Sequence, residues 1–296
     1  MKFFEISKST RQHLLQSQLD PDDIIQAVSR AFIEDLDGGE DVTSVATIPL
    51  DHKSTGEFVA RDSGVIAGID VVAVVLEMVG LSDIQLQISD SEKVVANTRL
   101  LIVRGNTREI LLAERTALNF ICHLSGIATL TDKWVEAVAG TNTKIRDTRK
   151  TIPGYRKLEK YAVRVGGAQN HRMSLSESAL IKDNHIVAAG GVEEAFSKVR
   201  SVYPTIEIEI EVDNLDQLAE IIPFAPDLVL LDNMSVAECQ SAVKQVNGRF
   251  ALEASGGLTL ESARLYAETG VNYLAVGALT HSSKVLDIGL DLKAEI

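Results

Sequence analysis

The chain has 296 residues, of which 45% are hydrophobic and 24% are charged, and its formal net charge at pH 7 is −13. This composition is typical of a globular protein that buries a sizeable core. It argues against nucleic acid and anionic membrane surfaces as main partners, because both require a broad excess of Lys and Arg.

The first 125 residues predict an α+β sandwich domain. Residues 20–33 carry apolar side chains at helical spacing, and Asp20-Pro21 supplies an N-cap followed by proline at the first helical position. Further along, short apolar runs separated by turn signals predict strands at 56–60, 64–68, 84–88 and 100–103 and a helix over 71–79.

Neither the cysteines nor the N-terminus points to secretion or a membrane. Cys122 and Cys239 lie in helical patterns, which favours buried thiols over a disulfide framework. The sequence begins without the apolar region of a signal peptide, and no run approaches the ~18 apolar residues of a membrane span. We therefore expect a cytoplasmic protein with no membrane partner.

From about residue 126 to residue 280 the pattern predicts an α/β barrel. Short aliphatic runs recur, each followed by a helical segment, which is typical of βαβ units with parallel strands. The last four runs start about 22 to 23 residues apart, a spacing that suits a compact barrel. The expected strands are 144–146, 179–181, 206–212, 228–231, 250–252 and 273–276. Residues 281–296 are expected to form a tail that packs near the N-terminal domain.

Polar residues follow these strands in series: Lys182, Glu211, Asp232, the run Glu253 to Gly257, and Gly277 come at or directly after the expected strand ends. In α/β barrels the active site lies at the carboxyl ends of the strands. One such residue is weak evidence, but a series of five predicts an enzyme site there.

A basic cluster indicates what this site binds. Between Lys144 and Lys182 there are ten Lys or Arg residues against three acidic ones, in a chain that is acidic as a whole. The pairs Arg149-Lys150 and His171-Arg172 fit no amphipathic pattern, and arginine matches the geometry of carboxylates and phosphates. We expect a small substrate with several negative charges.

Two glycine-containing turns are candidate phosphate sites, although both are also compatible with simple tight turns. The run Ser255 to Gly257 precedes a helix expected to open at Thr259, and Val276 to Ala278 offers a second group of backbone N–H donors. The distant basic cluster favours phosphate binding over the simpler interpretation.

Two carboxylate patterns stay open at this level. Glu207, Glu209 and Glu211 share one strand face, which suits either a solvated edge strand or a barrel interior where they would pair with Lys144 or Lys182. Asp232 suits either a functional role or the cap of a helix near Ser235.

The histidines give no spacing typical of a transition-metal site, and there is no Cys-x-x-Cys pattern. Magnesium stays possible, since one or two carboxylates and the phosphates of a substrate suffice to hold it. His171, between an amide-rich loop and Arg172, is placed to donate to an anionic ring substituent.

Several long ordered motifs resemble one known family, the nicotinate-nucleotide pyrophosphorylases (carboxylating), also called quinolinate phosphoribosyltransferases. The resemblance covers nearly the whole chain, and its most specific parts are residues 114–119, 147–154, 166–172, 180–185, 209–212, 231–233 and 255–257. One departure is Glu40, which stands between Gly39 and Asp41 where family members carry a Gly-Asp-[ILV]-Thr element.

The resemblance implies an α+β sandwich domain followed by an open, seven-stranded α/β barrel, assembled as a homodimer or a higher oligomer. It also implies that Arg115 enters the partner's active site. Lys150, Lys182, Glu211 and Asp232 would be catalytic, the last two also facing Mg²⁺ and the ribose. The implied substrate-binding residues are Arg115, Thr148, Arg149, Lys150, His171, Arg172, Lys182, Glu211, Asp232, Ser255, Gly256, Gly257, Val276, Gly277 and Ala278.

The implied reaction is transfer of phosphoribose from phosphoribosyl pyrophosphate (PRPP) to quinolinate, with loss of CO₂, giving nicotinate mononucleotide and pyrophosphate for NAD biosynthesis. Mg²⁺ would accompany PRPP, and no organic cofactor is expected.

Three alternatives remain. The first is a paralogue of the molybdate-transport type with another acceptor, which the intact basic set disfavours. The second is a Schiff-base aldolase using Lys182, which leaves five anion-binding residues unexplained. The third is a non-catalytic anion-binding protein, which Glu211 and Asp232 disfavour.

Overall fold

A computed structural model describes residues 3–294 of the chain. The chain divides into two compact units, each built from more than one segment of the sequence. The first unit comprises the described parts of Met1–Leu130, Lys157–Gly167 and Ser283–Ile296; the second comprises Thr131–Arg156 and Ala168–Ser282.

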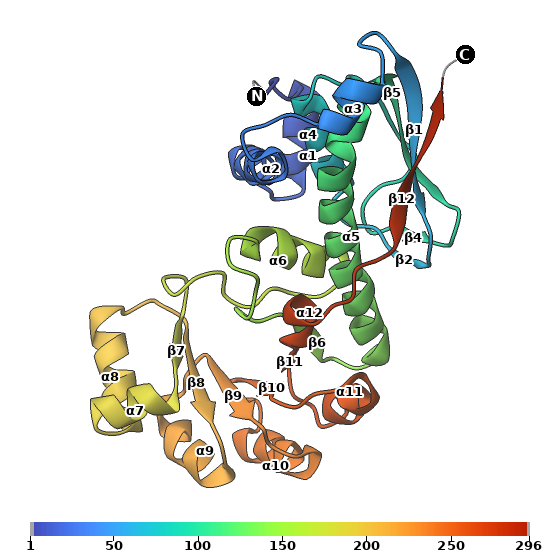
Figure 1. Cartoon of the computed structure of the whole chain (residues 1–296). Coiled ribbons are helices and arrows are strands. Elements are labelled where there is room, and N and C mark those ends of the chain that lie inside the picture. Colours follow the sequence, from blue (N-terminus) through green and yellow to red (C-terminus); the bar gives the residue numbers. More distant parts are fainter. Residues whose placement is uncertain (1–2, 295–296) are drawn as a thin grey trace. The chain divides into compact units, whose positions relative to one another are not determined.

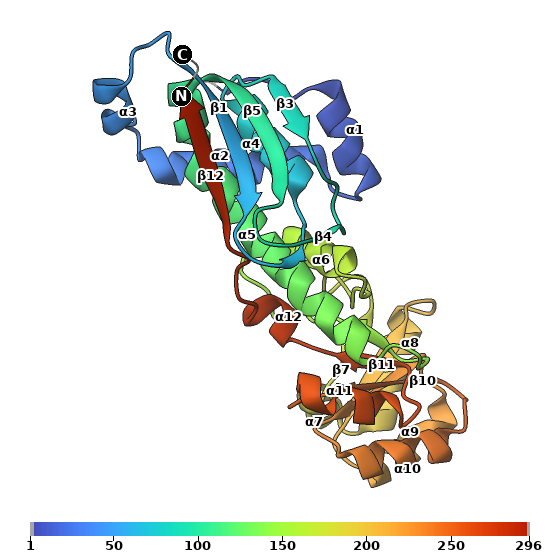
Figure 2. The ribbon, with the colours of Figure 1, turned by 90° about the vertical axis from the view of Figure 1, so that its right-hand side faces the viewer.

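The first unit is built on a four-stranded antiparallel sheet in the order β12-β1-β5-β3. Figures 1 and 2 show β12, near the C-terminus, lying beside β1. The elements of this unit are α1 (Lys8–Gln16), α2 (Pro21–Leu36), α3 (Val42–Thr47), β1 (Lys53–Ala60), β2 (Gly64–Val65), α4 (Ile69–Met78), β3 (Asp83–Leu86), β4 (Lys93–Val94), β5 (Arg99–Asn106), α5 (Thr107–Ala137, continuing into the second unit), α6 (Arg156–Val165, beginning at the boundary) and β12 (Ile288–Ala294).

Local sequence signals explain where two of these helices begin. Asp20 is the N-cap of α2 and accepts a hydrogen bond from the backbone N–H of Asp22, with Pro21 at the first helical position as predicted. Asp41 caps α3 and accepts from the N–H groups of Thr43 and Ser44. The unusual Glu40 is therefore an exposed residue directly before an ordinary helix cap.

The second unit has a six-stranded parallel sheet in the order β6-β11-β10-β9-β8-β7, and helices follow its strands along the chain (Figure 1). The α/β class expected from the sequence is confirmed, and each predicted strand is present. Its elements are β6 (Lys144–Arg146), β7 (Ala179–Ile181), α7 (Asp183–Ala189), α8 (Val192–Val202), β8 (Ile208–Val212), α9 (Leu215–Ile221), the short 3-10 helix η1 (Ile222–Phe224), β9 (Leu228–Asp232), α10 (Val236–Val246), β10 (Ala251–Ser255), α11 (Leu260–Ala267), β11 (Tyr273–Ala275) and α12 (Ala278–His281).

A seventh segment flanks β6 on its other edge. Gln169 makes an isolated parallel bridge with Arg146, in which the N–H of Gln169 donates to the carbonyl of Ile145 at 2.9 Å. With the Gln169 segment included, seven parallel segments lie side by side in this sheet. The Gln169 segment and β7 are its two edges, so the sheet is open.

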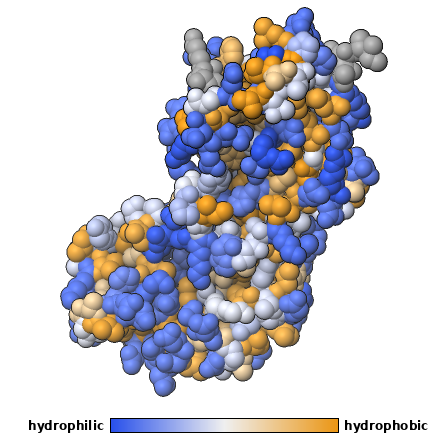
Figure 3. Space-filling model, in the orientation of Figure 1, coloured by the Kyte–Doolittle hydropathy of each residue, from blue (hydrophilic) through white to orange (hydrophobic). Residues whose placement is uncertain are grey.

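No helix among residues 3–294 is long and apolar enough to cross a membrane. On the face in Figure 3, hydrophilic and hydrophobic residues are interspersed. Large apolar side chains are buried in the core of each unit, for example Phe58 and Leu100 in the first unit and Ile210 and Leu274 in the second.

Candidate active site

A cavity of about 650 Å³ lies in the second unit, where the carboxyl ends of its strands meet. It brings together eleven of the residues singled out from the sequence: Thr148, Arg149, Lys150, His171, Arg172, Lys182, Glu211, Asp232, Ser255, Gly256 and Gly257. Leu180, Leu230, Asn233, Glu253 and Ala275 complete the lining. The series of polar residues at strand ends therefore did identify one site, as a parallel sheet requires.

Four expected residues are not among those that line this cavity. Arg115 is exposed on α5 in the first unit. Val276, Gly277 and Ala278 follow β11, and of these Gly277 lies against Lys150: a Cβ at Gly277 would be 3.1 Å from Cδ of Lys150. The absence of a side chain at Gly277 thus leaves room for Lys150.

Two guanidinium groups, those of Arg149 and Arg172, line the cavity. Arg172 is buried, and its Nη1 donates to the carbonyl of Ser178 at 2.6 Å. Arg149 is half-buried, and its Nε has no hydrogen-bond partner among the described residues. Burial and the charge of Arg149 lower the pKa of Arg172. Two arginines that repel each other across a cavity favour an anion between them.

Two carboxylates face these cations from neighbouring strands. Glu211 on β8 accepts from Nζ of Lys182 at 2.7 Å, and Asp232 at the end of β9 accepts from Nδ2 of Asn233 at 2.7 Å. Lys182 therefore forms an ion pair with Glu211. Lys182 is one of the two cations, with Lys144, that the sequence offered as partners for these glutamates in a barrel interior. The alternative in which Asp232 caps a helix is wrong, because the N-cap of α10 is Ser235, which accepts from the N–H of Glu238.

The interpretation of the three alternating glutamates as a single solvated edge is also wrong. Glu209 is buried and Glu211 is half-buried, whereas Glu207 is exposed and precedes β8. Strand β8 is an internal strand between β7 and β9, so its inward carboxylates need cations.

The loop after β10 turns sharply beside Asn233. Gly256 has φ = +86°, and a Cβ there would come within 2.2 Å of Oδ1 of Asn233 and 2.9 Å of its backbone N. Only glycine suits both the left-handed conformation and this close approach. Gly257 also has a positive φ but borders open space, so its main chain is accessible from the cavity that it lines.

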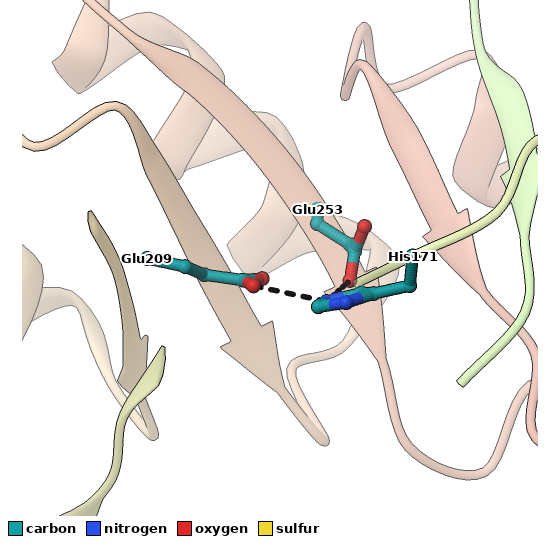
Figure 4. Close-up of side chains that lie close together, drawn as sticks. All are labelled: His171, Glu209 and Glu253. Carbon is teal, nitrogen blue, oxygen red and sulfur yellow. Dashed lines mark ion pairs between the residues drawn. The ribbon is translucent and has the colours of Figure 1, made fainter. Parts of the chain in front are cut away.

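His171 is held by protein groups on both ring nitrogens. Its Nδ1 accepts from the backbone N–H of Arg172 at 2.7 Å, and its Nε2 lies 2.9 Å from Glu209 and 3.4 Å from Glu253 (Figure 4). Burial lowers the pKa of His171, but the two carboxylates outweigh it and raise the pKa to about 9. In its neutral form the ring carries its proton on Nε2, because Nδ1 accepts the bond from Arg172, and a second proton on Nδ1 would displace that bond.

Glu253 and Arg146 were noted in the sequence, the first in the polar series at strand ends and the second in the basic cluster, but neither was given a role in the site. Nη1 of Arg146 donates to Glu253 at 3.0 Å, and the guanidinium carbon of Arg146 lies 4.4 Å from the ring centroid of Tyr273. Glu253 lines the cavity and lies two positions before Ser255 on β10, and residues two apart on a strand share a face. That period-2 signal could have assigned Glu253 to the site.

Lys182 does not have the surroundings of a Schiff-base lysine. Its amine is half-exposed and forms an ion pair with Glu211, whereas such lysines are usually activated by apolar burial or by a neighbouring cation. The cavity is instead lined by four cationic side chains and by carboxylates at the strand ends, the combination expected for a substrate with several anionic groups.

The fold and this cavity define an α/β-barrel enzyme that acts on small, multiply anionic substrates. Family models described as quinolinate phosphoribosyl transferase match residues 41–125 (N-terminal domain) and 127–291 (C-terminal domain). The chain belongs to the quinolinate phosphoribosyl transferase family.

Individual relatives agree with this assignment. The chain is 51% identical over 271 residues to the nicotinate-nucleotide pyrophosphorylase [carboxylating] of Mycobacterium leprae, covering 90% of this chain and 95% of that protein. It is 39% identical to a quinolinate phosphoribosyltransferase [decarboxylating] of Nicotiana tabacum, covering 93% and 83% respectively. The solved structure of the nicotinate-nucleotide pyrophosphorylase from Francisella tularensis has a TM-score of 0.88 at 40% identity, covering 92% of this chain and 96% of that one.

Proposed function

We propose that the chain is the enzyme that transfers phosphoribose from PRPP to the ring nitrogen of quinolinate and releases CO₂, pyrophosphate and nicotinate mononucleotide. The observation that carries the proposal is the cavity in which Arg149, Lys150, Arg172 and Lys182 oppose Glu211 and Asp232, in a chain that belongs to this family. The activity named for relatives that align over at least four fifths of their own length supports the same reaction.

Quinolinate carries two carboxylates, and the two arginines are suited to bind them. Arg149 has a guanidinium nitrogen, Nε, without a hydrogen-bond partner among residues 3–294, and Arg172 donates to the carbonyl of Ser178. Charge-assisted hydrogen bonds from fixed guanidinium groups bind and orient a planar dicarboxylate. Lys150, packed against Gly277, adds a further cation beside them.

Departure of pyrophosphate leaves positive charge on the anomeric carbon of the ribose. Glu211 and Asp232 are the carboxylates that stabilise this charge, while lysine and arginine side chains neutralise the leaving group. Once the ring nitrogen is quaternary, its positive charge stabilises the electron pair that the departing CO₂ leaves on C2, and a proton from water then adds to C2. The protein supplies position and electrostatics rather than a covalent nucleophile.

The donor set of the cavity also suits Mg²⁺. Glu211 and Asp232 offer oxygen ligands from neighbouring strands, and Asp232 accepts a side-chain hydrogen bond from the adjacent Asn233. Magnesium prefers one or two carboxylates together with substrate phosphates. Bound in this way, it would neutralise charge on the pyrophosphate.

The phosphates of PRPP and of the product are assigned to the loop Ser255 to Gly257 and to the turn Val276 to Ala278. The support is the open space beside the Gly257 main chain and the helix α11 that begins with its cap at Thr259.

The functional assembly is proposed to be a homodimer or a higher oligomer in which Arg115 serves the partner's site. Its exposure on α5 leaves this side chain available to a partner. A cytoplasmic location is likewise a prediction, which cell fractionation tests.

Purified protein incubated with quinolinate, PRPP and Mg²⁺ is expected to form nicotinate mononucleotide. Nicotinate in place of quinolinate is the control for acceptor choice. Absence of product with quinolinate, or equal product with nicotinate, would overturn the proposal and would favour a related transferase with another acceptor.

A further inference from the structure

A layer of charged side chains adjoins the cavity, and one of them, Glu253, is part of its lining. Glu209 precedes Glu211 by two residues on β8, Glu253 precedes Ser255 on β10, and Arg146 of β6 pairs with Glu253. Residues two apart on a strand share a face, so these side chains support those that line the cavity. Glu209 and Glu253 are 3% and 0% exposed, which makes their charges costly without partners.

His171 joins this layer to the cavity. Because its Nδ1 accepts from the N–H of Arg172, that nitrogen carries a lone pair, and the ring proton is on Nε2, which faces Glu209 and Glu253. The ring therefore connects the two buried carboxylates to the main chain of Arg172. From there the guanidinium of Arg172 reaches Ser178 and the cavity.

The same three residues could in principle hold a metal ion, since ligand atoms of His171, Glu209 and Glu253 lie within 4.8 Å of one another. Two contacts oppose that interpretation. A metal needs the lone pair of Nε2, but the bond at Nδ1 puts the proton on Nε2. Glu253 is also engaged by Arg146, whose positive charge repels a second cation.

We propose that Arg146, Glu209 and Glu253 are positioning residues for quinolinate binding, which fix the ring of His171 and, through it, Arg172. The inference rests on the proposed role of Arg172 in binding a quinolinate carboxylate. His171 then acts chiefly through Arg172, rather than by donating to the substrate ring.

The network has a chemical signature that can be observed in the wild-type protein. With ¹⁵N-labelled histidine, and at a pH above the raised pKa of about 9, the His171 signals, assigned by their loss in His171→Gln, should show a neutral ring protonated on Nε2. An Nδ1–H tautomer would overturn the proposal. Stoichiometric metal in purified protein that Glu209→Gln abolishes would overturn it in favour of a metal site.

The effect of the network on quinolinate binding is tested with Glu209→Gln, which keeps the size of the side chain but removes its charge. Calorimetric titration should show a Kd for quinolinate at least ~10-fold higher, the order expected when a charge-assisted hydrogen bond is weakened, with the melting temperature nearly unchanged. The matched control is Glu207→Gln, an exposed position on the same segment, which should leave the Kd unchanged.

Arg146→Lys keeps the charge and should retain more affinity than Arg146→Met. Unchanged quinolinate Kd in folded Glu209→Gln would overturn the positioning role. If wild-type protein itself fails to bind quinolinate, the proposed function fails instead, and the tautomer measurement still tests the hydrogen-bond network by itself.

Discussion

Replacement of Arg149 by alanine should weaken quinolinate binding but leave the stability of the folded protein nearly unchanged. The Nε of Arg149 has no partner among the described residues, and its charge opposes that of Arg172. Removing it breaks no buried hydrogen bond that the structure describes. We expect the free energy of unfolding to change by no more than ~0.5 kcal/mol.

Binding of quinolinate should respond strongly to the same change. Loss of one or two charge-assisted hydrogen bonds to a carboxylate costs ~2–3 kcal/mol, or roughly 30- to 150-fold in Kd. Arg172→Ala is the informative comparison, because that side chain also donates to the carbonyl of Ser178 at 2.6 Å. It should weaken binding to a similar extent and, unlike Arg149→Ala, also cost ~1–3 kcal/mol of stability.

The assays are calorimetric titration with quinolinate and unfolding in urea, each performed on both variants. An unchanged Kd for Arg149→Ala, or a large loss of stability without a change in Kd, would refute the assignment of Arg149 to the anion site.

Three further predictions concern catalysis, assembly and pH. Glu211→Gln and Asp232→Asn should each lower kcat by ~10²-fold or more while quinolinate still binds, since their role is in the transition state; near-wild-type kcat in both would remove them from catalysis. Mixing inactive Arg115→Ala with inactive Lys182→Ala should restore activity through hybrid dimers that contain one intact site; no recovery after verified subunit exchange would argue against a shared site. Burial raises the pKa of Asp90 to about 7, above its unfolded value of ~3.9, so its contribution to stability is present below pH ~4 and is lost as the pH rises through 7. Urea unfolding should therefore show Asp90→Asn gaining ~2 kcal/mol relative to wild type between pH 5 and pH 8; a constant difference would mean that Asp90 is ionised in the folded protein throughout this range.

The barrel and the lining of its cavity were predictable from local sequence signals. Strand spacing identified the parallel sheet, and polar residues such as Lys182, Glu211 and Asp232 at the strand ends identified the cavity. Both rules hold because each strand of a parallel sheet ends at the same edge.

Three features were not available from such signals. The pairing of β12 with β1 joins residues more than 200 positions apart, and local pattern does not encode such a partner. Glu209 alternates with apolar neighbours, and a glutamate on a solvated edge strand would show the same pattern. Its burial became clear only from the strand order, which places β8 inside the sheet. The bond from Arg172 to His171, which decides the role of the ring, depends on loop geometry.

The proposed reaction couples decarboxylation to phosphoribosyl transfer, and quinolinate labelled with ¹⁴C in its 2-carboxylate tests that coupling most directly. With PRPP and Mg²⁺ present, the purified protein should release one labelled CO₂ for each nicotinate mononucleotide formed, and none when PRPP is omitted. Formation of a nucleotide that retains the label, or release of CO₂ without PRPP, would contradict the account.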